Sequence, residues 1–185
     1  MKEISLNILD IAKNSTKAGA SLTQIIIDET EDTLTLIIED NGCGMTQEQV
    51  QSVCDPFFTS RTTRKVGMGI PLLKMACEQT DGHFEIISKA QSDNPLDHGT
   101  KVTAVFNKNH IDFTPVGDVT FSITTLIQGD PDVDFLYIHR TPKGEVSLDT
   151  RELREQLGDE VPLSTYEVIV WIGEYLKEQY DSLNQ

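Results

Sequence analysis

The sequence lacks the features that would place it in a membrane or in an oxidising compartment. No apolar run approaches the roughly 20 residues that a membrane-spanning helix needs, and the N-terminus, Met1–Ile4, has no secretory signal segment. The three cysteines cannot all pair with one another, and their spacing matches no metal-binding motif. We therefore expect a cytoplasmic protein with reduced, structural thiols and no membrane contact.

Positive charge is also scarce. The chain has 185 residues, with 30 acidic and 15 basic side chains and a formal net charge of −15. The excess is largest after residue 110, where 15 acidic residues stand against 5 basic ones. Such a surface repels phosphate backbones, so we expect binding neither to nucleic acids nor to anionic membranes. A nucleotide would have to be held by a local group of donors and a metal ion.

Hydropathy patterning divides the chain near residue 110, into a first domain (1–110) and an acidic α/β extension (111–185) that packs on it. For the first part the pattern predicts helices over 4–17, 46–53 and 68–79, and strands over 22–28, 34–39, 82–88 and 100–106. For the extension it predicts strands over 119–128 and 134–139, and helices over 149–157 and 165–180, capped by Asp149 and Ser164. The last helix has an apolar stripe, through whose Trp171 and Ile172 we expect it to cover the first domain.

Three polar side chains share one face of the first predicted helix. Asp10 and Asn14 are four residues apart and Lys17 is three further on, so they lie on the same side. Asn14 can offer its amide oxygen to a Mg²⁺ ion that also binds phosphate. Lys17 can meet the phosphates as a point charge, and Asp10 can orient or deprotonate a nucleophile. Taken alone, the same residues would be the solvated face of an amphipathic helix.

Two glycine-containing phrases add to this pattern. Asp40 directly follows a predicted strand and begins the phrase Asp-Asn-Gly-Cys-Gly-Met; its carboxylate can accept a hydrogen bond from the exocyclic amine of adenine. Gly67-Met68-Gly69-Ile70 opens a predicted helix whose N-terminal amides can hold phosphate. Each phrase is weak by itself, because Asp-Asn-Gly is an ordinary turn sequence and a lone G-x-G is common.

Together, the motifs resemble those of the GHKL superfamily, which includes histidine kinases, gyrase, MutL and the large heat-shock chaperones. Five motifs follow the family's order across residues 1–106: Asp10–Asn14, Asp40–Gly44, Asp55–Thr59, Gly67–Ile70 and Gly99-Thr100. The resemblance implies the Bergerat fold, an α/β (α+β) sandwich with a mixed, mostly antiparallel sheet covered by helices on one face. It also implies that ATP and Mg²⁺ bind between sheet and helices under a mobile lid, here residues 59–66.

The resemblance assigns roles position by position. Asn14 resembles the Mg²⁺ ligand and Asp40 the adenine-binding acid, beside which Thr100 acts through its hydroxyl and a water. Gly67 and Gly69 resemble the glycines that hinge the lid and cradle phosphate. The candidates for contact with ATP are Asn14, Lys17, Asp40, Gly42, Gly44, Met45, Arg61, Arg64, Lys65, Gly67, Met68, Gly69, Ile70 and Thr100. Asp10 and Lys17 are the catalytic candidates.

The branch within the superfamily stays open. Phe57-Phe58-Thr59 and Lys17 resemble histidine kinases, whereas Asn14-Ser15 resembles MutL. Asp10 stands where ATP-hydrolysing members carry a glutamate, and its side chain is shorter by one methylene. Because misplacement by about 1 Å can cost a factor of about a hundred, we expect hydrolysis to be slow or absent.

Autophosphorylation is not expected. No helical hairpin with a phosphoacceptor histidine precedes the first motif, and we expect His139, in the phrase His-Arg-Thr-Pro, to be an ordinary surface residue. We therefore predict an ATP-dependent protein kinase that acts in trans on an unidentified partner protein. The alternatives are a slow ATPase that serves as a conformational switch and a non-catalytic, nucleotide-responsive binding module. Whether the protein is a homodimer is left open.

Overall fold

A six-stranded sheet forms the centre of the molecule. The structure is a computed structural model that describes residues 3–54, 68–158 and 160–183. In chain order the elements are α1 (Ile4–Lys17), β1 (Leu22–Glu29), β2 (Thr33–Asp40), α2 (Gln47–Cys54), α3 (Gly69–Glu78), β3 (His83–Lys89), β4 (Gly99–Asn107), α4 (Val119–Gly129), β5 (Asp134–Thr141), β6 (Gly144–Asp149), α5 (Thr150–Leu157) and α6 (Tyr166–Leu183). The strand order is β3-β4-β2-β1-β5-β6, and every neighbouring pair is antiparallel except β1–β5.

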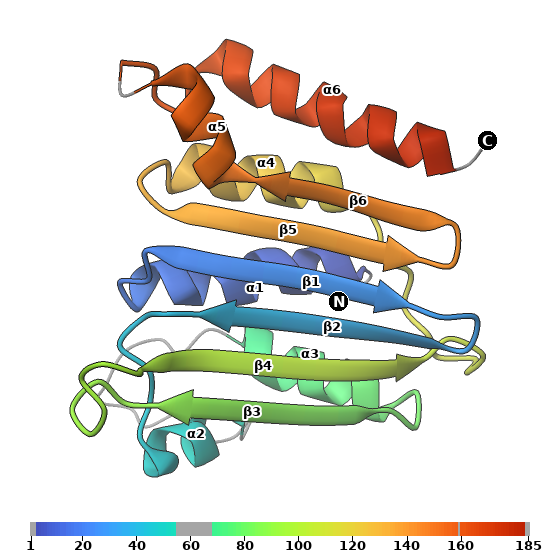
Figure 1. Ribbon diagram of the computed structural model, residues 1–185. Helices are drawn as coiled ribbons and strands as arrows, with labels where there is room; N and C mark the ends of the chain where they lie inside the picture. Colours follow the sequence, from blue (N-terminus) through green and yellow to red (C-terminus); the bar gives the residue numbers. More distant parts are fainter. Residues whose placement is uncertain (1–2, 55–67, 159, 184–185) are drawn as a thin grey trace.

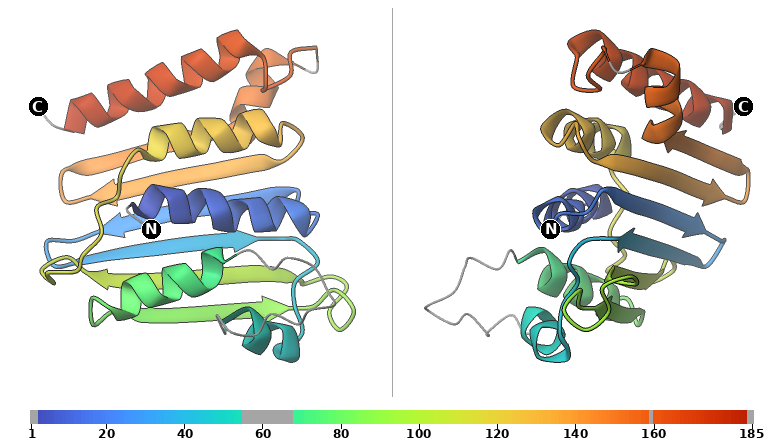
Figure 2. Two further views of the ribbon diagram at one scale, coloured as in Figure 1. Left: turned by 180° about the vertical axis from the view of Figure 1, so that it is seen from behind. Right: turned by 60° about the vertical axis from the view of Figure 1, so that its left-hand side comes forward.

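Helices cover one face of this sheet. Figures 1 and 2 place α1, α3 and α4 side by side behind it. Towards the β6 edge, α6 packs against α4 and β6, and α5 packs against β5. This is the mixed, mostly antiparallel sheet with helices on one face that the sequence predicts. Among the described residues, no helix combines the length and the apolar character that crossing a membrane requires.

The N-terminal half follows its hydropathy pattern. Along most of β1 and β2 every second residue is buried, as in a strand pair that packs one face on a core. Ile4, Ile8 and Ile11 recur at helical spacing along α1 and are buried in that core. After α1, Gly19 has a φ of 74°, a conformation that glycine adopts without strain. The helix predicted over 4–17 and the strands predicted over 22–28 and 34–39 are confirmed.

The prediction of a strand over 119–128 is wrong, because these residues form the helix α4. Its many β-branched residues favour a strand, but Val119, Ile123 and Leu126 are buried at helical spacing. Asp118 caps the helix by accepting a hydrogen bond of 2.8 Å from the amide of Phe121. The topology also requires a helix here, because β4 and β5 run in the same direction in one sheet. Such strands need a long crossover connection, usually a helix.

The helix α6 is only partly as predicted. Val168, Ile172 and Leu176, spaced four apart, are buried as expected. Trp171, however, is 47% exposed and stacks on the ring of Tyr175 at 5.0 Å instead of entering the core. Asp149 caps α5 as predicted, by accepting from the amide of Arg151. Ser164 does not directly precede α6, because that helix begins at Tyr166.

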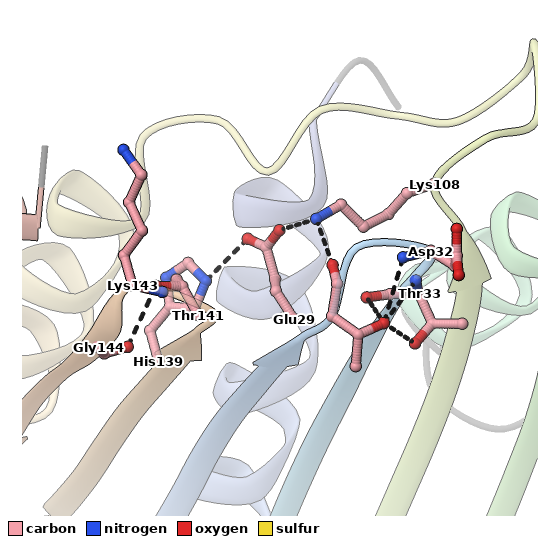
Figure 3. A network of polar contacts seen from close by, with 9 residues as sticks. Glu29, Asp32, Thr33, Lys108, His139, Thr141, Lys143 and Gly144 are labelled. Carbon is pink, nitrogen blue, oxygen red and sulfur yellow. Dashed lines mark hydrogen bonds and ion pairs between the residues drawn. The ribbon is translucent and has the colours of Figure 1, made fainter.

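A polar network joins the two halves of the chain at the far end of the sheet (Figure 3). Glu29 accepts from Lys108 Nζ at 2.6 Å and lies 2.9 Å from His139 Nε2. The other ring nitrogen of His139 lies 2.8 Å from the hydroxyl of Tyr180 on α6, which in turn contacts the hydroxyl of Tyr137. His139 is 5% exposed, so the expectation of a surface histidine is wrong. The sequence could not reveal this, because the partners come from three distant segments.

Candidate functional site

The predicted base-binding residues meet at one end of the sheet, where β2 ends and β4 begins. The strand register places Asp40 directly opposite Thr100 on one side and Thr23 of β1 on the other. Two residues further into the sheet, Ile38 and Val102 are buried under the helices. Because alternate residues of a strand share a face, the side chains of Asp40, Thr100 and Thr23 lie in one row on the helix-covered face.

The carboxylate of Asp40 is held in place from both sides. The hydroxyl of Ser15 on α1 donates to Oδ2 at 2.7 Å, and the amide of Gly42 donates to Oδ1 at 2.9 Å. Each carboxylate oxygen keeps capacity to accept a further hydrogen bond. Sequence reasoning did not single out Ser15, which is 3% exposed. The available signal was its spacing, since position 15 lies four residues after Ile11 on the buried side of the helix.

Thr23 presents an unusual hydroxyl beside this carboxylate. Its side chain is fully buried, and its Oγ1 has no hydrogen-bond partner among the described residues. A buried polar atom without a partner costs about 1–3 kcal/mol. The residues of the row that keep solvent exposure are Asp40 and Thr100. An accepting carboxylate beside a hydroxyl fits a polar, flat ligand such as a nucleobase.

A second missed residue, Ser88 on β3, organises the other side of the row. Its hydroxyl accepts from the amide of Met45 at 2.8 Å and donates to the carbonyl of Gly99 at 3.0 Å. The hydroxyl of Thr100 lies 2.8 Å away. Since the proton of Ser88 points to Gly99, Thr100 donates its own proton to Ser88 and keeps both lone pairs for other contacts. Ser88 thus links the predicted residues Met45 and Thr100.

Two glycines of the site are required by close backbone packing. Gly44 has a φ of 63°, and a Cβ atom built there would lie 1.9 Å from the carbonyl oxygen of Lys89. Gly99 has a φ of 139°, and its Cβ would lie 2.0 Å from the carbonyl oxygen of Asp40. A side chain at either position would push the loop after β2 away from the turn between β3 and β4. The glycines therefore keep the walls of the site together.

The predicted phosphate-side residues are divided between α1 and the start of α3. Gly69 opens α3 directly against α1, since a Cβ there would lie 3.0 Å from the Cβ of Asp10. Ile70 is buried and belongs to the core, whereas Met68 is 66% exposed.

The side chains of Asp10, Asn14 and Lys17 make no hydrogen bond or ion pair within the described residues, and each of the three has some solvent exposure. They are accessible on the α1 face beside the first turn of α3. Arg61, Arg64, Lys65 and Gly67 lie outside the described residues.

The three cysteines are free thiols, as predicted. Cys77 is fully buried, and its burial raises the pKa of its thiol to about 11. A thiol with so high a pKa is a poor nucleophile at neutral pH. Burial also raises the pKa of Cys54, and Cys43 in the loop after β2 is exposed.

Comparison with known protein families shows which family the chain belongs to. Residues 1–110 match the family of histidine kinase-, DNA gyrase B- and HSP90-like ATPases. The match covers more than half of the chain. The chain belongs to this family. It contains a histidine kinase-like ATP-binding domain, and the GHKL resemblance inferred from the five motifs is confirmed.

Relatives of this ATP-binding domain occur within larger sensor proteins. The probable C4-dicarboxylate sensor kinase of Bacillus subtilis is 34% identical over 82 residues, which are 44% of this chain and 14% of that protein. The sensor protein SrrB of Staphylococcus aureus is 34% identical over 94 residues, 48% of this chain and 16% of that protein. The chain therefore spans only a small part of the length of these relatives.

Solved structures show the same fold. The ADP-bound MutL ATPase domain of Aquifex aeolicus aligns with a TM-score of 0.56 at 14% identity, over 85% of this chain and 68% of that domain. The N-terminal domain of a DNA repair protein aligns with a TM-score of 0.55 at 18% identity, over 80% of this chain and 53% of that one. Coverage this high extends past residue 110, so part of the C-terminal segment shares the fold.

Proposed function

We propose that this domain binds Mg-ATP at the Asp40 end of the sheet and is the ATP-binding part of a protein kinase that acts in trans on a partner protein. The observation that carries the proposal is the row of Thr23, Asp40 and Thr100, with Asp40 fixed by Ser15 and Gly42. A site whose acceptor is already held in place binds its ligand without paying to order that side chain.

In this proposal the adenine base occupies the row. Its exocyclic amine donates to the carboxylate of Asp40, and Thr100 offers its lone pairs to a bound water or to the base itself. Gly42, Gly44 and Met45 form the adjoining wall through the backbone contacts described above.

The phosphates would then lie along α1 towards the first turn of α3. Asn14 contributes one oxygen ligand to Mg²⁺, and Lys17 contributes a positive charge. No group of three His, Cys, Asp or Glu side chains within the described ranges could hold a metal ion by itself, so this site relies on phosphate oxygens and water for the remaining ligands. When bound, the ion neutralises charge on the phosphates during transfer. The amides that begin α3 point to the same region.

Asp10 bears on the reaction that follows. The Cβ of Asp10 lies next to Gly69, the first residue of α3, beside which we propose that the phosphates bind. In the kinase proposal it orients the hydroxyl or imidazole of a partner protein. With water as the nucleophile, the same carboxylate would support hydrolysis, which is the second candidate function. A module that binds nucleotide without chemistry is the third.

Two measurements separate these functions. Isothermal titration with Mg-ATP tests binding: Asp40→Asn, which presents an amide donor to the adenine amine, should weaken binding at least tenfold. Asp112→Asn, a change at an exposed aspartate in the loop after β4, at the opposite end of the sheet from Thr100, should leave binding unaltered. Unchanged affinity in Asp40→Asn would refute the proposed base site. With γ-³²P-ATP, label on a partner protein supports the kinase, free phosphate supports the ATPase, and neither supports the binding module.

A further inference from the structure

A groove between α4 and α6 is separate from the proposed nucleotide site. It has a volume of about 450 Å³, and its walls include Phe121 and Thr124 of α4 and Ile169, Val170 and Gly173 of α6. In Figures 1 and 2 these helices lie towards the β6 edge, whereas β2 and β4 carry the nucleotide site. None of the candidate ATP-binding residues lines it.

Apolar side chains that are not buried in the core are exposed on the walls of the groove. Ile123 and Leu126 of α4 and Ile172 of α6 already bury the core-facing sides of these helices. Phe121 nevertheless remains 59% exposed and Val170 38% exposed on the groove walls. A helix with apolar residues beyond its core-facing stripe has a second surface to cover. Phe121 and Val170 thus give a bound partner an apolar surface within the groove.

The shape of the groove suits a helix. The helices α4 and α6 run antiparallel (Figures 1 and 2), with 11 and 18 residues. At 1.5 Å per residue, α4 is about 16 Å long, which matches about three turns of a third helix laid alongside it. Gly173 deepens the middle of the groove, since a Cβ built there would meet only Thr124, at 3.9 Å. Helices bind such grooves through anchors spaced at i, i+4 and i+7.

The charges beside the groove indicate which helix would bind. Four exposed carboxylates follow spacings of seven, four and three residues along α6, so they form one ridge next to the groove: Glu167, Glu174, Glu178 and Asp181. Lys177 is the one basic residue on that wall, and none of the 11 residues of α4 is charged. A second copy of the chain would bring another acidic ridge and be repelled. A basic helix would be attracted, and complementary charge favours encounter and orientation.

We infer that the α4–α6 groove binds an amphipathic, basic α-helix of a partner protein. The apolar stripe of that helix lies on Phe121 and Val170 and covers Gly173. Its lysine or arginine side chains face the ridge formed by Glu167, Glu174, Glu178 and Asp181. This interaction surface goes beyond the proposed function, because it does not depend on a bound nucleotide.

The test uses the full chain and three fluorescently labelled synthetic peptides of 16 residues. The first has leucines at helical spacing and lysines elsewhere. The second has glutamates in place of the lysines, and the third has the composition of the first with leucines at alternate positions. Fluorescence anisotropy should show binding of the first peptide and at least tenfold weaker binding of the other two. No binding of the first peptide, or equal binding of all three, would overturn the inference.

Variants of the groove residues test whether the peptide binds in the groove. Gly173→Leu, which fills it, and Phe121→Ala, which removes one wall, should each weaken binding of the first peptide at least tenfold. Gly129→Leu and Leu96→Ala are the matched controls, since Gly129 has no atom within 4 Å of its added Cβ and Leu96 is fully exposed in a loop. Each variant is first checked for an unchanged melting temperature. If Gly173→Leu and Phe121→Ala both bind like the wild type, the groove is not the site.

A second pair of variants tests the charge. Neutralising the ridge (Glu167→Gln, Glu174→Gln, Glu178→Gln and Asp181→Asn) should weaken peptide binding at least tenfold at low salt. The control neutralises four exposed acids elsewhere in the same half of the chain, Asp132, Glu152, Glu155 and Glu160. Equal losses in both variants would mean general attraction to an acidic protein and would overturn the inference. So would a sedimentation experiment in which the wild type dimerises and Gly173→Leu abolishes the dimer, because the occupant would then be a second copy.

Discussion

The hydroxyl of Ser15 donates a 2.7 Å hydrogen bond to the carboxylate of Asp40 and so connects the first helix to the end of β2. The two residues are 25 positions apart, and both flank the site proposed for the adenine base. Through this bond the helix that carries Asn14 and Lys17 is fixed relative to the strand that carries Asp40. The proposed phosphate and base contacts are therefore parts of one rigid unit.

Ser15→Ala should weaken both the fold and nucleotide binding. A hydrogen bond to a charged group contributes about 1.5–3 kcal/mol, and its loss leaves Asp40 held by Gly42 alone. We expect the free energy of unfolding to fall by about 2 kcal/mol and Mg-ATP to bind several-fold more weakly, measured by urea denaturation and calorimetry. Ser92→Ala, at an exposed loop serine, is the control. Unaltered ATP affinity in Ser15→Ala would show that this bond does not prepare the site.

Gly44→Ala should destabilise the protein more than an ordinary glycine replacement. Two costs combine: a positive φ, which costs a non-glycine residue about 1–2 kcal/mol, and a Cβ atom 1.9 Å from the carbonyl of Lys89. Gly19→Ala isolates the second cost, because Gly19 also has a positive φ of 74° but no atom within 4 Å of an added Cβ. Thermal melts should therefore place Gly44→Ala clearly below Gly19→Ala. Similar melting temperatures would mean that the loop moves aside at little cost.

Elements with local signals could be predicted from the sequence. The β1–β2 hairpin consists of two apolar runs rich in β-branched residues, separated by a polar turn. The helix α2 begins where Thr46 and Gln49 satisfy each other's amides in a capping box. The prediction of a strand over 119–128 was wrong because the β-branched composition of these residues favours a strand locally, whereas the crossover between β4 and β5 imposes a helix. The need for a helix between β4 and β5 can be recognised only when the strand order of the sheet is known. In this segment the topology outweighs the local strand propensity.

The residues of the candidate site also divide into those that the sequence predicts and those that only the structure reveals. The motif order identified Asp40 and Thr100, and the register places them opposite one another. Ser15 and Ser88 were missed because each supports the site through a hydrogen bond that forms only in the folded protein. Thr23 was missed because only the strand register places it opposite Asp40. A serine or threonine in a strand or helix carries no sign in sequence of which distant residue it will meet.

The free energy of unfolding should fall at acidic pH, because Glu29 becomes protonated. Its hydrogen bond from His139 and the charge and hydrogen bond of Lys108 lower the pKa of Glu29 from 4.5 to about 2, against the opposing effect of burial (Figure 3). Because the folded-state pKa is the lower one, the carboxylate stabilises the fold fully above pH 4.5. This stabilisation, about 3 kcal/mol at 1.36 kcal/mol per pH unit, is lost as the pH falls towards 2.

Glu29→Gln tests this contribution, because glutamine cannot titrate. Urea denaturation at several pH values should find the variant less stable than the wild type at pH 7, with a difference that shrinks from pH 4.5 downward. Glu31→Gln, an exposed residue two positions away, should follow the wild type. A difference between Glu29→Gln and wild type that stays constant from pH 7 to pH 2.5 would contradict the assigned role.

Asp10 offers the sharpest test of the proposed chemistry, because changes there can separate binding from reaction. Asp10→Asn keeps the size of the side chain and removes its basicity, and Asp10 makes no hydrogen bond within the described residues that the change would break. We therefore expect Mg-ATP affinity to change by no more than about twofold, while transfer of γ-phosphate to a partner or to water falls about a hundredfold or more. Asp10→Glu extends the carboxylate by one methylene and should raise hydrolysis if reach is what limits it. Asp112→Asn, at an exposed aspartate in the loop after β4 and at the opposite end of the sheet from Thr100, is the control. Should Asp10→Asn bind and turn over ATP like the wild type, this carboxylate takes no part in the reaction, and the nucleophile must be oriented by another group.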